Sequence, residues 1–373
     1  MPPLRVLALE PYFGLSHRTF LEGYSRFSRH DVVLWTLPPR KWKWRMRGAA
    51  WRFADLAREA PAGLEPDVTL ASDFLNLADW HAMAPRAFRD APSILYFHEN
   101  QATYPLGAKA PRDHHYGWIN LASALAADRV LFNSCFHRRE FLSEARRVLG
   151  RMPDHLPLDV AGRIERKSGV FPVGIDFTPH REALLRAPRR ENPVPVLVWN
   201  HRWEEEKGPE EMVDALFRLK ERGVPFRAVL CGQSSRVAPA AMLRARGLGP
   251  ELQHLGFFED RSGYLEALAG ADLVLSTARQ EFFGVSVVEA LFMGCLPVLP
   301  RALSYVEIIP LALHDAFLYD GPSHLDDLLG KLLARLPVEH RRELEEAAAR
   351  YDWKDLAGKL DDIVEETHAK ERA

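Results

Sequence analysis

The chain has 373 residues, and its 49 lysines and arginines nearly balance its 51 aspartates and glutamates, which gives a formal net charge of −2. Its content of 47% hydrophobic and 27% charged residues is ordinary for a soluble globular protein and excludes a disordered, collagen-like or disulfide-stapled chain. The balanced charge excludes a globally basic nucleic-acid-binding protein, although it leaves local patches open, and the length is sufficient for two domains.

Along the chain, short β-branched runs alternate with longer patterns of helical period, such as 211–220 and 264–269. This alternation predicts an α/β protein with parallel sheets and helices on both faces, arranged as two Rossmann-like, doubly wound domains. The first series of predicted strands is 5–9, 32–36, 68–72, 93–97, 129–133 and 169–173, and the second is 194–199, 227–231, 252–256, 272–276 and 296–299.

The strands are interrupted once, between 177 and 195, where prolines and arginines predict an interdomain linker. We therefore expect an N-terminal domain over 1–187, a C-terminal domain over 188–350 and a ligand-binding cleft between the carboxyl ends of the two sheets. The final segment, 351–373, contains a helical pattern over 355–366 that can lie on either domain, including back on the first.

The three cysteines, Cys135, Cys231 and Cys295, are far apart and show neither metal nor redox spacing. Their odd number argues against a disulfide framework and fits a reducing compartment. No signal peptide is recognisable, and there is no run of about 18 uncharged apolar residues. We expect a cytoplasmic protein without a membrane segment; the oligomeric state stays open.

The strongest chemical signal is the sequence Glu281-Phe-Phe-Gly-Val-Ser-Val-Val-Glu289, which follows the predicted strand 272–276 and opens a helix. Backbone N–H groups at the start of a helix are unpaired donors at a positive end and suit a diphosphate, and a glycine there allows a close approach. Alone, two glutamates at this spacing are also compatible with an ordinary surface helix. The predicted diphosphate-binding residues are Phe283, Gly284, Val285 and Ser286, with Glu281 on one side of the ligand and Glu289 on the other.

A second signal follows the first predicted strand of the second domain. Arg202 and Lys207 flank a turn, and Pro209 suits the first position of a helix. Two cations at such a turn can neutralise a leaving diphosphate, although salt bridges to the glutamates of 204–206 explain them equally well. Together with the paired glutamates of the first signal, these cations favour a diphosphate site.

A third signal is the segment 40–47, in which five of eight residues are cationic and two are tryptophans, with no acid between Asp31 and Asp55. Cations contact phosphates and indole rings stack on unpaired bases, so the segment suits a nucleic acid. It is equally compatible with a basic helix start whose tryptophans pack on the core. The candidate contacts are Lys41, Trp42, Lys43, Trp44, Arg45 and Arg47.

A fourth signal is the sequence His98-Glu99-Asn100-Gln101 at the end of a predicted central strand, where ligand sites of such sheets lie. Ser16 and His17, in the first strand-to-helix connection, are expected to line the same cleft. No second histidine or acid stands at metal-ligand spacing from His98, so we expect no metal site.

The strand, the Arg-turn-Lys-Gly segment and the paired glutamates resemble the retaining GT-B glycosyltransferases. The resemblance narrows to the tRNA-queuosine α-mannosyltransferase family and spans about residues 5–353. Two positions depart from the family pattern, because Leu15 and Asn200 stand where the family tends to have glycine and proline. The segments that carry the narrower resemblance are 37–45, 96–101, 153–155, 199–203, 281–285 and 305–310.

The resemblance implies transfer of mannose from GDP-mannose to queuosine in a tRNA anticodon, with retention of configuration and without a metal or other cofactor. Arg202 and Lys207 would bind the donor phosphates, Glu281 and His98 the sugar, and Glu289 the ribose. The departing diphosphate would take the acceptor proton. The tRNA-binding N-terminal domain would supply the acceptor-binding residues Ser16, His17, Lys41, Trp42, Lys43, Trp44, Arg45, Arg47, Glu99, Asn100 and Gln101, and Glu99 would orient an acceptor hydroxyl.

Two alternatives stay open at this point. One is a retaining GT-B hexosyltransferase that acts on a polysaccharide, a lipid or a small molecule, and the basic segment 40–47 distinguishes it. The other is a non-catalytic tRNA-binding protein with a vestigial sugar site, which the presence of both glutamates and both donor cations disfavours. The residues themselves leave the nucleotide base, the sugar and the tRNA isoacceptor open.

Overall fold

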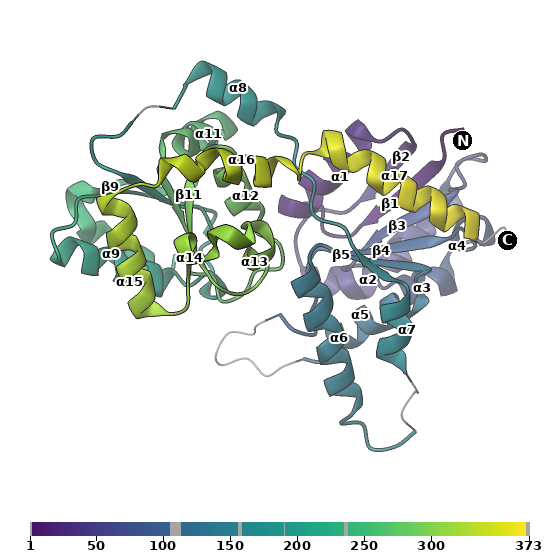
Figure 1. Ribbon diagram of the computed structural model, residues 1–373. Helices are drawn as coiled ribbons and strands as arrows, with labels where there is room; N and C mark the ends of the chain where they lie inside the picture. The colour runs from purple at the N-terminus through teal and green to yellow at the C-terminus, as the bar shows by residue number, and fades with distance from the viewer. Residues whose placement is uncertain (1, 105–112, 156–158, 190, 235–237, 371–373) are drawn as a thin grey trace. The chain divides into compact units, whose positions relative to one another are not determined.

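The computed structural model describes residues 2–104, 113–155, 159–189, 191–234 and 238–370. The chain forms two compact units, each an α/β layer structure around one sheet of six parallel strands (Figure 1). The first unit consists of residues up to Asp176 together with those from Tyr351 onward, and the second unit runs from Phe177 to Arg350.

In the first unit the strand order is β2-β1-β3-β4-β5-β6. The direction of winding changes between β1 and β3, and ligands of such sheets bind outside the carboxyl ends of the strands at this point. The strands are β1 (Arg5–Glu10), β2 (Asp31–Thr36), β3 (Val68–Ser72), β4 (Ser93–Phe97), β5 (Arg129–Phe132) and β6 (Ser168–Val170). The helices are α1 (Leu15–Phe27), α2 (Trp42–Glu59), α3 (Leu77–Met83), α4 (Arg86–Arg89), α5 (His115–Ala126), α6 (Cys135–Leu149), α7 (Val160–Arg166) and α17 (Trp353–Lys370).

In the second unit the order is β12-β11-β10-β7-β8-β9, and the winding changes between β7 and β10. The strands are β7 (Val196–Trp199), β8 (Arg227–Cys231), β9 (Leu252–Gly256), β10 (Leu273–Leu275), β11 (Leu296–Pro300) and β12 (Leu318–Tyr319). The helices are α8 (Thr178–Arg186), η1 (Glu205–Lys207), α9 (Pro209–Glu221), α10 (Ala240–Arg244), η2 (Ala245–Glu251), α11 (Arg261–Gly270), α12 (Val285–Phe292), α13 (Tyr305–Ile308), η3 (Leu311–Leu313), α14 (His314–Phe317), α15 (Pro322–Ala334), η4 (Val338–His340) and α16 (Arg341–Ala349).

The predicted alternation of strands and helices is confirmed, and every strand expected from the sequence overlaps a strand of the structure. Strands β3 and β4 are buried along their whole length, which is why they are continuous apolar runs. The short edge strand β12 is additional. In the part of the chain that the structure describes, no helix is long and apolar enough to cross a membrane.

The segment 177–195 is not simply a linker, as the sequence analysis expected. It contains α8, which packs on α11 and buries His180 and Ala183, so the second unit begins at Phe177 and not at 188. The side chain of Phe177 stacks on Phe292, with ring centroids 3.8 Å apart. Pro179 lies in the first turn of α8, where proline starts a helix and does not break one.

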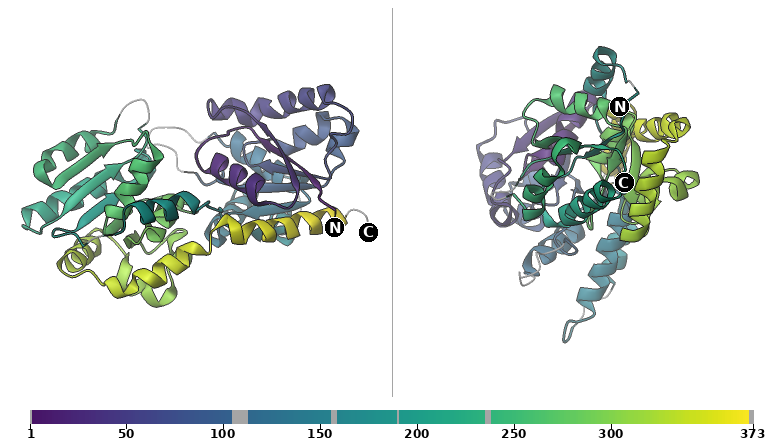
Figure 2. Two further views of the ribbon diagram at one scale, coloured as in Figure 1. Left: turned by 90° about the horizontal axis from the view of Figure 1, so that it is seen from above. Right: turned by 90° about the vertical axis from the view of Figure 1, so that its left-hand side faces the viewer.

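The C-terminal helix α17 belongs to the first unit, where it contacts α1, β3 and β4. The left view of Figure 2 shows it, in yellow, running along this unit. Trp353 at its start is completely buried, and its indole ring leaves no room for a side chain at Gly23, where a Cβ atom would lie 2.1 Å from the ring. This close approach explains the glycine on the buried face of α1.

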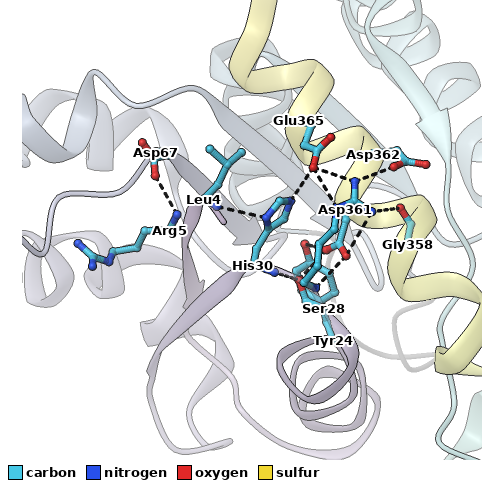
Figure 3. A network of polar contacts seen from close by, with 11 residues as sticks. Leu4, Arg5, Tyr24, Ser28, His30, Asp67, Gly358, Asp361, Asp362 and Glu365 are labelled. Atoms are coloured by element: carbon cyan, nitrogen blue, oxygen red, sulfur yellow. Dashed lines mark hydrogen bonds and ion pairs between the residues drawn. The ribbon is translucent and has the colours of Figure 1, made fainter. Parts of the chain in front are cut away.

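A buried carboxylate holds α17 in place (Figure 3). Asp361 accepts hydrogen bonds from the Tyr24 hydroxyl at 2.9 Å, the Ser28 hydroxyl at 2.6 Å and the backbone N–H of Arg29 at 3.0 Å. Its side chain is 2% exposed, whereas that of the neighbouring Asp362, which pairs with Arg29, is 66% exposed. The two aspartates therefore differ in burial while they share a partner.

Replacing Asp361 with asparagine should lower the free energy of unfolding by about 3 kcal/mol, because the amide presents N–H groups where hydrogen-bond donors already converge. Asp362→Asn is the matched control and should cost about 0.5 kcal/mol or less, since exposed ion pairs contribute little. Urea unfolding followed by circular dichroism measures both. Equal losses for the two variants would contradict this account of α17.

Candidate functional site

The second unit contains a buried ion pair at the carboxyl end of its sheet. Lys207, the last residue of η1, and Glu281, in the loop between β10 and α12, lie 2.9 Å apart from Nζ to Oε2. Their side chains are only 9% and 17% exposed. Burial by itself would raise the pKa of Glu281, but the ammonium of Lys207 holds this pKa below its usual value. The Glu281 side chain is thus a carboxylate at neutral pH.

The backbone around this pair is fixed on both sides. Gly208 has a φ of 64°, and a Cβ atom there would lie 2.2 Å from the carbonyl oxygen of Thr277. The Thr277 hydroxyl donates to the Gly208 carbonyl at 2.8 Å, and the Ser304 hydroxyl donates to the Phe283 carbonyl at 2.9 Å. Lys207 and Glu281 are therefore held on rigid turns.

The start of α12 follows Glu281 directly. Gly284 has a φ of 97°, which glycine adopts without strain, and the helix begins at Val285. The first N–H groups of a helix have no partner within it, so those of Val285 and Ser286 form the donor end predicted from the sequence. Phe283 is buried before this turn. The amide of Asn200, at the end of β7, donates to the Ser286 carbonyl at 2.8 Å and ties the first turn to the sheet.

Glu289, in the second turn of α12, has its own set of partners. It pairs with Arg261, accepts a hydrogen bond from the Tyr264 hydroxyl at 3.1 Å and lies 3.3 Å from Nε2 of His180. Burial alone would raise the pKa of Glu289, but the positive charge of Arg261 lowers it to about 2. The sequence analysis missed these three partners, because α8 and α11 carry no motif and only packing brings them to α12.

Arg202 forms salt bridges to the glutamates of 204–206, the alternative to phosphate binding that its sequence context allowed. Its guanidinium pairs with Glu204 at 3.2 Å and with Glu206 at 3.8 Å. Burial and a hydrogen bond donated to Glu206 raise the pKa of Glu204 to about 7. The neighbouring His201 is buried, and burial together with the charge of Lys207 lowers its pKa to about 3. Lys207 does not use the 204–206 acids for its ion pair but pairs with Glu281.

In the first unit the fold brings two of the predicted site residues together. His98 follows β4 and His17 lies in the first turn of α1, and their ring centroids are 4.0 Å apart. Ser16 is half-buried beside them. Leu15, where the family pattern has glycine, has a φ of 49°, a conformation that glycine adopts more easily.

The sequence analysis missed a third partner, Glu10 at the end of β1. Its Oε2 lies 3.0 Å from Nδ1 of His17, and its Oε1 accepts a hydrogen bond from the Tyr12 N–H at 2.7 Å. Ligand atoms of Glu10, His17 and His98 all lie within 4.8 Å of one another, so the fold supplies the second histidine and the acid that sequence spacing around His98 did not reveal. Because protein donors already satisfy both Glu10 oxygens, we assign Glu10 and His17 as a hydrogen-bonded ion pair and not as metal ligands.

The three residues after His98 shape a loop. Asn100 is fully buried, and its amide oxygen accepts from the Thr103 N–H at 2.8 Å. Gln101 donates its amide to Glu99 at 2.8 Å and its backbone N–H to Asn120 at 2.8 Å. Glu99 is half-buried at the start of this loop.

The basic segment 40–47 forms the start of α2, and its two tryptophans differ. Trp42 packs on Phe74 and Tyr116 at the edge of the core. Trp44 is 55% exposed and meets Trp51, which is 49% exposed, edge to face at 6.1 Å. Trp51 lies two turns further along the same helix face, beyond the segment that the sequence analysis considered.

Two cations of this segment lie over aromatic rings. Lys43 lies over the rings of Trp42 and Tyr116, and Arg47 over the ring of Tyr116. Lys41 is exposed, while Arg45 is half-buried and donates to the Pro38 carbonyl at 3.3 Å. Burial, and then the charge of Arg40, lowers the pKa of Arg45. The surface thus combines exposed indoles with clustered positive charge.

Comparisons with known proteins cover both units. The family model described as "tRNA-queuosine alpha-mannosyltransferase N-terminal" matches residues 5–175, and the model "Glycosyl transferases group 1" matches residues 181–351. The tRNA-queuosine alpha-mannosyltransferase of Drosophila melanogaster is 34% identical over 380 residues, which cover 99% of this chain and 98% of that protein. A GDP-mannose-dependent alpha-(1-6)-phosphatidylinositol dimannoside mannosyltransferase of Mycobacterium tuberculosis is 28% identical over 306 residues, or 80% of this chain and 73% of that protein.

Among solved structures, sucrose-phosphate synthase from Thermosynechococcus elongatus matches with a TM-score of 0.71 and 16% identity, over 98% of this chain and all of that chain. An identity this low speaks to the fold alone. Together with the two parallel sheets, it confirms the predicted two-domain GT-B fold.

Proposed function

The chain is a glycosyltransferase of the tRNA-queuosine alpha-mannosyltransferase family, and we propose that it transfers mannose from GDP-mannose to queuosine in a tRNA anticodon, with retention of configuration. The observation that carries the proposal is the buried Lys207–Glu281 pair at the start of α12. The printed name of the mycobacterial relative, a GDP-mannose-dependent enzyme, supports the choice of donor.

In this proposal the second unit binds the nucleotide sugar. Lys207 and the N–H groups at the start of α12 face the diphosphate, and Glu281 accepts hydrogen bonds from the sugar hydroxyls. Glu289 accepts hydrogen bonds from the ribose. Arg202, which is half exposed and paired with Glu204 and Glu206, exchanges these acids for a phosphate oxygen when the donor binds.

The transfer step needs no protein nucleophile. The bond from the sugar C1 to the diphosphate oxygen breaks, and the bond from C1 to the acceptor oxygen forms on the same face. The acceptor proton passes to the departing diphosphate. Lys207 and the helix start stabilise the negative charge that develops on this leaving group, and their fixed backbone means that little reorganisation is required.

The first unit binds the acceptor. The exposed Trp44–Trp51 pair and the surrounding cations fit unstacked bases and phosphates of an RNA loop. A neutral polysaccharide acceptor offers no phosphates for these cations, and the family match over residues 5–175 favours tRNA over an anionic lipid. A vestigial sugar site does not account for the buried Lys207–Glu281 ion pair. A cytoplasmic location is part of the proposal, and the buried thiols of Cys231 and Cys295 are in keeping with it.

A panel of donors tests the proposal. The protein is incubated with queuosine-containing tRNA and, separately, with GDP-mannose, GDP-glucose, UDP-glucose or ADP-glucose, and the digested nucleosides are weighed by mass spectrometry. We expect a hexose mass gain on queuosine with GDP-mannose and less with the others. Efficient transfer from a UDP- or ADP-sugar would overturn the choice of donor.

Removing the exposed indoles should weaken tRNA binding. Trp44→Ala and Trp51→Ala should each raise KM for tRNA about tenfold, because stacking on one base is worth about 1–3 kcal/mol. Phe257→Ala, which removes an exposed ring from the second unit, is the control and should leave KM unchanged.

A variant with Lys41, Lys43, Arg45 and Arg47 replaced should also show a flatter dependence of KM on salt. Unchanged KM values would speak for another acceptor.

A further inference from the structure

The contact between His17 and His98 has a consequence for the chemistry of His98. Three aromatic rings pack around the His98 ring. The distances between ring centroids are 4.0 Å to His17, 4.7 Å to Tyr96 and 5.2 Å to Phe20. Its backbone N–H donates to Asp73 at 2.8 Å. Its Nδ1 is buried and has no hydrogen-bond partner within the described ranges. The ring is therefore positioned by packing, with little hydration to support a charge.

We propose that Glu10 and His17 are positioning residues for His98: Glu10 holds the proton on the His17 ring, and the charged His17 ring, packed against His98, keeps His98 in place and uncharged. This inference rests on the proposed function, in which His98 contacts the transferred sugar. Glu10 bonds to His17 at 3.0 Å, and Glu10 itself is held by the N–H of Tyr12. Two imidazole rings with centroids 4.0 Å apart repel each other strongly when both carry a proton.

The electrostatics of the two rings agree with this assignment. Burial by itself would lower the pKa of His17, but the carboxylate of Glu10 raises it to about 9. Burial, and then the charge of His17, lowers the pKa of His98 well below its ordinary value. The proton therefore belongs to His17 across the physiological range.

Burial disfavours the charged form of the other ionisable groups packed around His98, and Glu99 lies at the edge of the site. Burial raises the pKa of the Asp73 carboxyl and of the Tyr96 phenol, and burial lowers the pKa of His137. Glu99 is half-buried and bonded to Gln101. The charges that face His98 from the elements packed on it are thus mainly those of Glu10 and His17.

An uncharged His98 suits glycosyl transfer. Positive charge develops on the sugar ring in the transition state, and an imidazolium against that ring would oppose it. A neutral imidazole has one donor and one acceptor nitrogen and can still orient a sugar hydroxyl. The arrangement keeps the positive charge one ring away from the sugar and pairs it with Glu10.

The test first replaces His17, which carries the positive charge, and then replaces its partner Glu10 as well. In His17→Gln the carboxylate of Glu10 has no cation beside it, so His98 should take up the proton near neutral pH. We expect kcat to fall about tenfold at pH 6 and to recover as the pH rises, while KM for tRNA stays within twofold. In the double variant Glu10→Gln/His17→Gln the carboxylate is gone as well, and the loss of kcat at pH 6 should be smaller than in His17→Gln. Glu22→Gln, an exposed carboxylate on the same helix, is the control.

Nuclear magnetic resonance of ¹⁵N-histidine gives a readout that does not depend on transfer. In the wild type, we expect His98 to be neutral at pH 6 and His17 to lose its proton near pH 9. In His17→Gln, His98 should be protonated at pH 6. The proposal is overturned if His17 is neutral at pH 7 in the wild type, if kcat of His17→Gln is reduced equally at every pH, or if a chelator abolishes activity and zinc restores it. Absence of hexose transfer by the wild type would refute the proposed function, and the ring protonation states would still decide this inference.

Discussion

Replacing Lys207 with methionine is expected to lower kcat for hexose transfer about 100-fold or more, the usual effect of removing one preorganised group that stabilises developing negative charge. Two losses combine in this variant. The leaving diphosphate loses its buried cation, and Glu281 becomes a buried carboxylate without its 2.9 Å partner. Binding of the donor should weaken as well, because in the proposed site the same ammonium faces the diphosphate before and after the bond breaks.

A second lysine in the same unit provides the control. Lys220 also pairs with a glutamate, Glu251, at 3.0 Å, but this pair is more exposed and lies at the end of α9. Lys220→Met should leave kcat within twofold of the wild type. Glu281→Gln should lower kcat as well, and its effect combined with Lys207→Met should be smaller than the product of the two single effects, since the residues act as one pair. If the double variant lost as much kcat as the product of the two single effects, or if Lys207→Met had a normal kcat, the pair would not be part of the transfer site.

Replacing Glu289 with glutamine is expected to raise KM for the donor about tenfold or more and to change kcat little. Hydrogen bonds to a charged group contribute about 1.5–3 kcal/mol, and the ribose lies away from the bond that breaks, so the loss should affect ground state and transition state alike. Arg261→Met should act in the same direction, because Arg261 orients this carboxylate. Arg244→Met removes a comparably exposed arginine paired with Asp214 and is the control.

The same variant has a pH-dependent signature. The folded-state pKa of Glu289 is about 2, which is below the ordinary value of a glutamate. A carboxyl group whose pKa falls on folding stabilises the protein above its unfolded-state pKa, and this stabilisation is lost as the pH falls towards the folded-state value. The difference in free energy of unfolding between wild type and Glu289→Gln should therefore be constant above about pH 5 and shrink between pH 4.5 and 2. A difference that grows on acidification would contradict the assigned ion pair.

Most of the fold could be predicted because parallel strands buried on both faces are apolar runs that stand out from their surroundings. The exceptions have specific causes. Strand β12 has only two residues, too few for a pattern. Helix α8 lies in a segment rich in proline and arginine, and only its packing against α11 shows that it belongs to the second unit.

Site residues that belong to a short sequence motif could be predicted. Site residues that only the packing of the fold brings together could not. The turn at Gly284 and the cation Lys207 carry recognisable motifs, and the structure pairs Lys207 with Glu281. Glu10 was missed because a single acid at the end of a strand has no pattern until the fold sets it beside His17. Trp51 could have been predicted, because it lies two turns beyond Trp44 on the same helix face. It was missed because only the basic segment 40–47 was considered.

The acceptor is the most direct test of the account. Two tRNAs of the same sequence, one with queuosine and one with guanosine at the modified position, are incubated with the protein and radiolabelled GDP-mannose, and the nucleosides are separated after digestion. We predict label on the queuosine nucleoside and none in the guanosine-containing tRNA. Equal labelling of both tRNAs, or label in neither while another acceptor is glycosylated, would contradict the account.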